Sequence, residues 1–360
     1  MVETKVGKDP EVPVKVAVVQ AEPCWFDAES AVKKTCALIR EAAAGNTQLI
    51  AFPELWIPGY PNFLWAHDHK TCVDYMRKYY RNAVELDSEQ MLAIRGAAQE
   101  GKIMVILGYA ERDRGSLFMS QTFIGPNGEV LRHRRKFKPT SWERVLFGDG
   151  TGDLVNNVVQ TKLGRVGGLQ CFEHLQPLLK YNTYAQGEQI HVASWPNLFP
   201  AVGEMPYFNT VEATKIASQM YAMEGSCFVL LASHIQTKLG LRANGLEIEG
   251  EVMEKSGDAT PHTAVVGGGF SCVIGPDGRQ LSEPVPADWE GIIFHDLDFN
   301  KIYLAKNVVD PVGHYSRPDI FTLQVRDTKH GYRAVEGKAS SAVEGLEHDI
   351  VAELEEEVHV

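Results

Sequence analysis

Cys171 lies where an apolar run ends and a helix is predicted to begin. Residues 166–169 are predicted to form a short buried strand, Pro177 suits the first turn of a following helix, and Gly187 suits its C-terminal end. We expect a thiol on such a turn to be partly exposed and to face helix N–H groups. These would lower its pKa below the free value of about 8.5 and make it a nucleophile. A buried structural cysteine is the alternative for Cys171 taken alone.

Glu54 follows a second apolar run at residues 49–52, and it is flanked by Pro53 and by the turn-forming residues 58–61. A carboxylate held rigidly just after a buried strand is partly removed from water. Its pKa is then raised, which suits it to act as a general base. An acidic residue on a surface loop is the alternative.

Lys136 lies in a cationic run at residues 132–138, and Pro139 fixes the path of the chain after it. An ammonium in this place can face negative charge that develops during a reaction. A solvated basic surface is the alternative. Glu143 follows closely and is a candidate to orient either Lys136 or the general base. Glu, Lys and Cys, each after a predicted strand, together form a candidate catalytic group.

The elements that position these residues alternate between strands and helices. The first predicted helix is capped by Asp27, and the second by Asp87 or Ser88. This alternation indicates an α/β protein. The predicted strands of this part are residues 14–20, 48–52 and 103–107.

Two hairpin turns of similar sequence follow, one at Asn127-Gly128 and one at Asp277-Gly278. Each comes after helix and strand material, so the chain is expected to contain two related αβ halves within one domain. The alternative is that turn chemistry alone produces the likeness.

Several segments around these residues resemble the nitrilase superfamily of carbon–nitrogen hydrolases, and within it the nitrilases proper. The resemblance covers residues 13–325, leaving residues 1–12 as an N-terminal extension and residues 326–360 as a polar acidic tail. It implies a four-layer αββα sandwich, a homodimer that assembles into larger homo-oligomers or spirals, and no metal or organic cofactor. The similar segments are residues 52–54, 57–61, 134–140, 171–174, 187–196 and 310–319.

The resemblance also implies a Glu54–Lys136–Cys171 triad, with Glu143 as a further catalytic residue. The substrate would be a small nitrile, which the Cys171 thiolate attacks to give a thioimidate and then a thioester. The products would be a carboxylic acid and ammonia, with some amide. A cyanide hydratase or an amidase with the same triad is one alternative, and a non-catalytic assembly protein on this fold is a more distant one.

Substrate contacts are expected from Tyr60, Phe172, Trp195 and Pro196, with the backbone N–H of Phe172 facing the developing charge. The sequence departs from the nitrilase pattern at Phe172, where nitrilases usually carry Trp, and at residues 141–142, where many carry His-Val. The smaller ring of Phe favours a roomier pocket, and therefore aryl or arylmethyl nitriles.

The overall composition excludes several other classes of protein. The chain has 360 residues, a formal net charge of −12 and six cysteines without Cys-x-x-Cys spacing. The negative charge argues against nucleic-acid binding, and the histidines show no metal-ligand pattern. No signal peptide or membrane-spanning run is visible, so a cytoplasmic protein with reduced thiols is expected. Residues 236–268 are expected to form a surface loop or lid, and the acidic tail to lie outside the core.

Overall fold

The first strand, β1 (Val14–Ala21), supplies side chains to two different layers, because successive residues of a strand point to opposite faces. Val16 and Val18 pack into a core between two sheets, whereas Ala17 and Val19 pack against helices on the outer side. Strands buried on both faces in this way are typical of sheets covered by helices. The structure is a computed structural model that describes residues 10–200, 206–248, 251–252 and 265–326.

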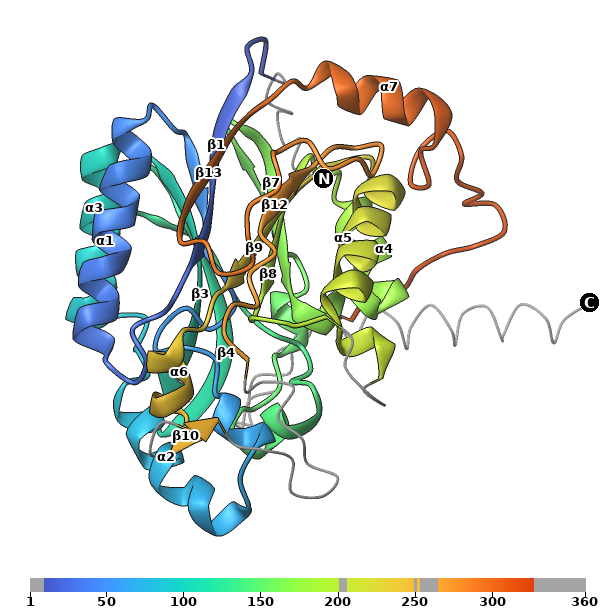
Figure 1. The fold of residues 1–360 in the computed structure, drawn as a ribbon. Coiled ribbons are helices and arrows are strands. Elements are labelled where there is room, and N and C mark those ends of the chain that lie inside the picture. The colour runs from blue at the N-terminus through green and yellow to red at the C-terminus, as the bar shows by residue number, and fades with distance from the viewer. Residues whose placement is uncertain (1–9, 201–205, 249–250, 253–264, 327–360) are drawn as a thin grey trace, which may run out of the picture. The chain divides into compact units, whose positions relative to one another are not determined.

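The first sheet has the spatial order β5-β4-β3-β2-β1. On the edge of β1 that faces away from β2, β13 pairs with β1. Helices α1 and α3 pack on its outer face (Figure 1). Asp27 caps α1, as predicted, and Ser88 rather than Asp87 caps α3. The elements are α1 (Ala28–Ala44), β2 (Leu49–Ala51), α3 (Glu89–Gly101), β3 (Met104–Asp113), β4 (Ser116–Ile124), β5 (Val130–Arg135) and β13 (Gly291–Leu297).

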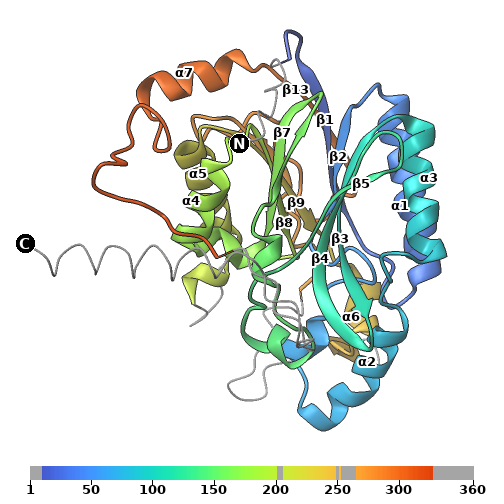
Figure 2. The ribbon, with the colours of Figure 1, turned by 180° about the vertical axis from the view of Figure 1, so that it is seen from behind.

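The second sheet has the order β9-β8-β7-β6, and β12 pairs antiparallel with β9. Helices α4 and α5 pack on its outer face (Figure 2). It meets the first sheet where β1 and β9 pair at Gln20↔Ser233 and Ala21↔His234. The elements are β6 (Val158–Thr161), β7 (Gly164–Gln170), α4 (Pro177–Ala185), β8 (Ile190–Trp195), α5 (Val211–Gly225), β9 (Phe228–His234) and β12 (Cys272–Ile274).

The inner faces of the two sheets share one hydrophobic core. Val18 of β1 and Ile106 of β3 lie in the same cluster as Val192 of β8 and Leu230 of β9. Helices α1 and α3 cover one outer face and α4 and α5 cover the other, as both views show (Figures 1 and 2). The predicted four-layer αββα sandwich is therefore confirmed.

The two predicted hairpin turns occupy equivalent places in the two sheets. β4 lies antiparallel beside β3, and β12 lies antiparallel beside β9. Gly128 and Gly278 both have positive φ values, of 79° and 80°. Each donates its N–H to the carbonyl of the glycine that opens its turn, Gly125 or Gly275, at 2.9 Å. The φ values and hydrogen bonds follow from the shared turn sequence, and the antiparallel neighbours of β3 and β9 agree with two related halves.

The region predicted to be a surface loop or lid, residues 236–268, is partly packed into the fold. Its described part contains α6 (Lys238–Ala243) and the short strands β10 (Glu247–Ile248) and β11 (Glu251–Val252), and Leu241 and Leu246 are buried. Apolar side chains that lack strong periodicity can still be buried, so the loop prediction was wrong here. Residues 249–250 and 253–264 lie outside the described residues.

None of the described helices has the length and apolar character needed to cross a bilayer. Most of the predicted extension, residues 1–9, and nearly all of the predicted tail, residues 327–360, lie outside the described residues. The remaining elements are the 3-10 helices η1 (Asn62–Trp65), η2 (Ser141–Val145), η3 (Gly152–Leu154), η4 (Cys171–Leu175) and η5 (Tyr207–Asn209), and the helices α2 (His69–Arg81) and α7 (Asn300–Val308).

Candidate active site

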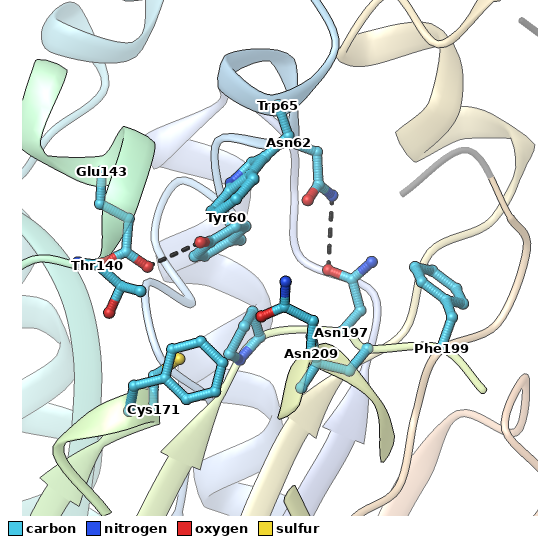
Figure 3. Close-up of a pocket in the computed structure, with 12 residues that line it drawn as sticks. Tyr60, Asn62, Trp65, Thr140, Glu143, Cys171, Asn197, Phe199 and Asn209 are labelled. Carbon is cyan, nitrogen blue, oxygen red and sulfur yellow. Dashed lines mark hydrogen bonds between the residues drawn. The ribbon is translucent and has the colours of Figure 1, made fainter. Parts of the chain in front are cut away.

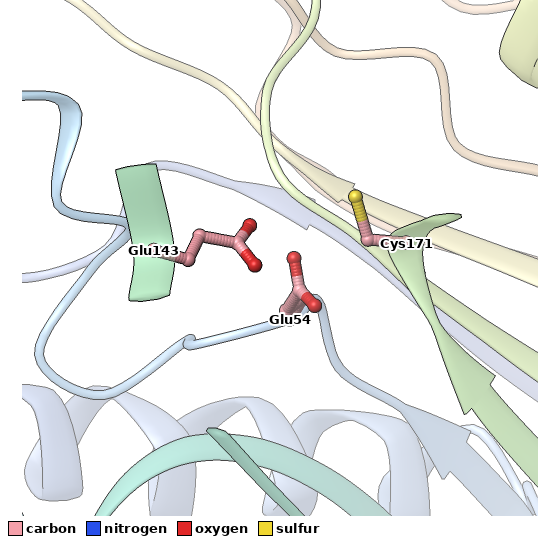
Figure 4. Close-up of side chains that lie close together, drawn as sticks. All are labelled: Glu54, Glu143 and Cys171. Atoms are coloured by element: carbon pink, nitrogen blue, oxygen red, sulfur yellow. The ribbon is translucent and has the colours of Figure 1, made fainter. Parts of the chain in front are cut away.

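The three residues predicted to form a triad each follow a strand: Glu54 after β2, Lys136 directly after β5, and Cys171 directly after β7. The structure brings them together, with side chains that are almost completely buried. The Lys136 Nζ atom lies 2.9 Å from Glu54 Oε1. Ligand atoms of Glu54, Glu143 and Cys171 lie within 4.8 Å of one another, and Figure 4 shows the three side chains converging from different elements.

Two glycines allow the backbones of Glu54 and Lys136 to approach their neighbours closely. A Cβ at Gly108 of β3 would lie 2.3 Å from the Pro53 carbonyl oxygen and 3.0 Å from the Glu54 Cα. A Cβ at Gly150 would lie 2.9 Å from the Lys136 carbonyl oxygen, which accepts a hydrogen bond from the Gly150 N–H. Any side chain at these positions would displace a candidate catalytic residue.

Burial of Glu54, opposed by the Lys136 ammonium and reinforced by the Glu143 carboxylate, raises the pKa of Glu54 to about 8. This agrees with the direction expected from the sequence. A carboxylate with a pKa near neutrality can both accept and return a proton, as a general base and acid must.

Burial opposes the charged form of Lys136, but the carboxylates of Glu143 and Glu54 more than compensate, so the pKa of Lys136 is raised. Its side chain is therefore an ammonium. Two of its three N–H groups face these carboxylates, at 2.8 Å and 2.9 Å. The third can serve a reacting atom.

Glu143 is the hub of a buried hydrogen-bond network. One carboxylate oxygen accepts from the Tyr60 hydroxyl at 2.7 Å, and the other accepts from Lys136 at 2.8 Å and from the Thr140 N–H at 2.5 Å. The last contact belongs to a capping box that begins η2. Because both of its oxygens accept hydrogen bonds, and one of them accepts from the Lys136 ammonium, Glu143 is suited to hold this ammonium in place.

The environment of Cys171 differs from the sequence-based prediction. The residue opens the 3-10 helix η4 rather than an α-helix, with a φ of 49°, and its side chain is buried. Burial raises the pKa of the thiol, although the Lys136 ammonium lowers it in part. The predictions of a partly exposed thiol and a lowered pKa were therefore wrong. The resting group is a neutral thiol, and it needs a nearby base to become a nucleophile.

A buried ion pair that the sequence analysis did not single out connects the ends of β5 and β7. Arg134 donates two hydrogen bonds to the Glu173 carboxylate, at 2.6 Å and 2.8 Å. Glu173 also accepts the N–H groups of Phe137 and Gln170, both at 2.9 Å. These contacts fix the segment of Lys136 against that of Cys171. Arg134 and Glu173 both lie in segments that resemble nitrilases, residues 134–140 and 171–174. This resemblance was the sequence signal that could have identified the pair.

A pocket lined mainly by aromatic and carboxamide side chains leads to Cys171 (Figure 3). Three predicted substrate contacts, Tyr60, Phe172 and Pro196, line it. Trp195 is not among the lining residues. It is fully buried and packs edge-to-face with Phe172, with ring centroids 5.9 Å apart. The other lining residues are Asn62, Trp65, Thr140, Glu143, Asn197, Leu198, Phe199 and Asn209.

Asn197 was not among the substrate contacts predicted from the sequence. Its side-chain amide group has an N–H donor that no described residue accepts. Its Oδ1 faces the Asn62 Nδ2 at 3.5 Å, and this Nδ2 also donates to the Gln236 Oε1 at 2.8 Å. The orientation is fixed at the far end, where the Gln236 Nε2 donates to the Val265 carbonyl at 3.2 Å. The Asn197 Nδ2 is buried and has no hydrogen-bond partner among the described residues.

Glu54, Glu143 and Cys171 are the described residues whose types and spacing could hold a metal ion. The Lys136 ammonium, however, bonds to both of these carboxylates. A metal ion shared by the carboxylates would have to displace that ammonium. Since Lys136 already supplies positive charge beside the thiol, the donor set suits acid–base and nucleophilic chemistry better than metal coordination.

The sequence profile described as "Carbon-nitrogen hydrolase" matches residues 15–307. An arylacetonitrilase of Aspergillus niger is 49% identical over 313 residues, which cover 87% of this chain and 92% of the relative. An aliphatic nitrilase of Rhodococcus rhodochrous is 40% identical over 351 residues, covering 95% of this chain and 88% of the relative. The crystal structure of a carbon–nitrogen hydrolase from Helicobacter pylori has the same fold, with a TM-score of 0.65 and 18% identity over 85% of this chain and 96% of that one.

The chain therefore belongs to the carbon–nitrogen hydrolase family. Its curated relatives group it with the nitrilases of that family, which confirms the resemblance inferred from the motifs.

Proposed function

We propose that this chain hydrolyses arylacetonitriles to the carboxylic acid and ammonia through a covalent intermediate on Cys171. The observation that carries the proposal is the buried contact of Lys136 with both Glu54 and Glu143, beside Cys171, at the end of an aromatic pocket.

The first half of the reaction forms the carbon–sulfur bond. Glu54, as carboxylate, takes the proton of the Cys171 thiol, and the sulfur adds to the nitrile carbon. Negative charge develops on the nitrile nitrogen, where the Lys136 ammonium and the Phe172 N–H stabilise it. The proton held by Glu54 then passes to this nitrogen, giving a neutral thioimidate.

The second half uses two waters. Glu54 takes a proton from the first water, which adds to the thioimidate carbon to give a tetrahedral intermediate. Glu54 returns this proton to the amino nitrogen, which leaves as ammonia, and a thioester remains on Cys171. The second water then cleaves the thioester to the carboxylic acid and the free thiol. If the tetrahedral intermediate loses the thiol instead, the product is an amide. The acid-to-amide ratio thus reports which bond of one intermediate breaks first.

The aromatic lining of the pocket supports a substrate that carries an aryl group. Phe172 lies directly after the nucleophile and contacts the rings of Trp195 and Phe208, with centroids 5.9 Å and 6.1 Å away. Trp65 and Phe199 line the same pocket. Aromatic walls favour an aromatic substrate. The arylacetonitrilase relatives at 49% and 50% identity support the same substrate class.

We also propose that the protein forms homodimers that assemble further, and that it works in the cytoplasm. The outer helices carry large exposed apolar side chains, among them Leu178 of α4 and Ile216 and Met220 of α5. Such side chains on one layer favour association with a second copy. All six cysteines are free thiols, which suits a reducing compartment. Light scattering of the purified full chain tests the assembly.

A panel of aliphatic, aromatic and arylaceto nitriles tests the substrate class, with ammonia, acid and amide measured for each. We expect the highest kcat/KM for arylacetonitriles, acid as the main product, and no turnover in Cys171→Ala. A preference for aliphatic nitriles would contradict the proposed substrate. Amide as the main product would instead favour a hydratase, and turnover of amides but not nitriles an amidase.

A further inference from the structure

A buried chain of hydrogen bonds runs from the layer of α4 and α5 to the backbone of the nucleophile. His174 Nδ1 lies 2.7 Å from the Cys171 carbonyl oxygen, and His174 Nε2 lies 2.9 Å from His191 Nε2. His191 Nδ1 lies 2.8 Å from Glu188 Oε1, and the Tyr221 hydroxyl donates to Glu188 Oε2 at 2.7 Å. The proposed mechanism uses none of these four side chains, although all are buried.

The direction of each hydrogen bond in this series follows from its terminal acceptor, the Cys171 carbonyl oxygen. A carbonyl oxygen only accepts, so His174 Nδ1 carries a hydrogen, and the Nε2 of a neutral His174 accepts. His191 Nε2 must then donate, and His191 Nδ1 must accept. The remaining donor is Glu188 Oε1, as a protonated carboxyl group.

The burial of these groups is consistent with that assignment. Burial raises the pKa of Glu188 and lowers the pKa of both His174 and His191, so each group is held neutral. Gly167 of β7 provides the space for Glu188, because a Cβ there would lie 2.1 Å from its Oε1. The ring of His174 also stacks on Trp195, with centroids 5.1 Å apart.

The carbonyl that His174 holds belongs to the same peptide group as the N–H of Phe172. This bond is trans, since the one cis peptide of the described chain is Ile57-Pro58. In a planar trans peptide the C=O and N–H point in opposite directions. Holding the Cys171 carbonyl toward His174 therefore turns the Phe172 N–H away from His174, and this N–H favours the charged form of the Cys171 sulfur by lowering its pKa in part.

Resting on the proposed role of Cys171, we propose that His174 is a positioning residue, which through the His191–Glu188 chain fixes the Cys171–Phe172 peptide so that the Phe172 N–H faces the reacting nitrogen. The left-handed φ of 49° at Cys171 makes such support necessary, since a residue other than glycine adopts this conformation at a cost. His174 is not among the residues that line the pocket.

Two substitutions at His174 separate the hydrogen bond from the ring. His174→Phe removes both nitrogens, and His174→Asn keeps an N–H near the place of Nδ1. We expect kcat per titrated active site to fall at least tenfold in His174→Phe with KM within threefold of wild type, and to recover most of the loss in His174→Asn. Tyr184→Phe is the matched control, since this buried hydroxyl of the same layer bonds Glu224 instead.

Equal losses in the Phe and Asn variants, or full activity in His174→Phe, would overturn the proposal. A direct measurement needs no variant: 15N solid-state NMR of the histidine-labelled full chain reports which ring nitrogen is protonated. We expect one Nε2-to-Nε2 histidine pair with the hydrogen on Nδ1 in one ring and on Nε2 in the other. Both rings protonated on Nε2, or a charged ring, would contradict it. Because this readout is independent of turnover, it separates failure of this inference from failure of the proposed function, which Cys171→Ala tests.

Discussion

Lys136 and Glu143 form a fully buried ion pair, with Nζ 2.8 Å from Oε2, and the same ammonium reaches Glu54 at 2.9 Å. The cation is therefore held between two carboxylates of different character. The Glu143 carboxylate accepts three hydrogen bonds, whereas the Glu54 carboxylate forms an ion pair with Lys136 and has a raised pKa. This asymmetry assigns proton transfer to Glu54 and positioning to Glu143.

Cys171→Ala is expected to abolish ammonia release, because no other described cysteine lies in the candidate site. A thiol reagent should also inactivate the wild type, and a saturating nitrile should protect Cys171 from labelling, as measured by mass spectrometry. Cys24, which is only partly buried, serves as the control whose labelling the nitrile should not change. Residual turnover in Cys171→Ala would contradict covalent catalysis by this residue.

Lys136→Met is expected to lower kcat by at least two orders of magnitude, about 3 kcal/mol, the size of a lost oxyanion donor. Lys138→Met is the matched control. Lys138 is half exposed and pairs with Asp149 on the surface, so its loss should change kcat less than threefold. Circular dichroism checks that both variants are folded. Similar losses in the two variants would mean that the wrong lysine has been assigned.

The pH dependence follows from the pKa of Glu54, about 8. Only its carboxylate form can accept the thiol proton, so kcat/KM should rise about tenfold per pH unit below pH ~8 and level off above it. Glu143→Gln removes a negative charge that raises this pKa, so the rise should move to lower pH while the plateau falls. Asp149→Asn, a surface carboxylate, should leave the profile unchanged. A shift to higher pH in Glu143→Gln would contradict the assignment.

The α/β class and the position of Glu54, Lys136 and Cys171 after strands could be predicted, because they depend on local sequence patterns. Apolar runs before Glu54 and Cys171 and a cationic run at Lys136 placed these residues at strand ends, and the Asn-Gly and Asp-Gly pairs marked two similar turns. The thiol pKa could not be predicted, because it depends on burial by distant segments rather than on the helix that follows.

The sequence analysis also missed residues whose role depends on neighbours that are distant in the sequence. The glycines at 108 and 150 look ordinary in sequence, yet each leaves room for the backbone of a candidate catalytic residue. Trp195 was expected to contact the substrate, but neighbouring residues at a strand end face different sides, and the ring of Trp195 stacks on that of His174.

Phe172→Trp is expected to shift the specificity of the enzyme toward smaller nitriles. The Phe172 ring lines the pocket and contacts Trp195 and Phe208, so the larger indole must extend into the substrate space. The ratio of kcat/KM for a bulky arylacetonitrile to that for a small aliphatic nitrile measures the shift, and the acid-to-amide ratio should be followed beside it. An unchanged profile and product ratio would show that this ring does not contact the substrate.

Asn197→Leu is expected to reduce discrimination in favour of arylacetonitriles that carry a hydrogen-bond acceptor. The Asn197 Nδ2 lacks a partner among the described residues, and a buried donor gains free energy when a ligand supplies an acceptor. The loss of one such bond, about 1 kcal/mol, should lower kcat/KM about fivefold for hydroxylated substrates and leave the parent phenylacetonitrile unaffected or improved. Asn209→Leu is the matched control, because Asn209 lines the same pocket but is only half-buried and can bond water. If Asn197→Leu lowers kcat/KM equally for both substrates, the amide supports the pocket wall and does not read the substrate.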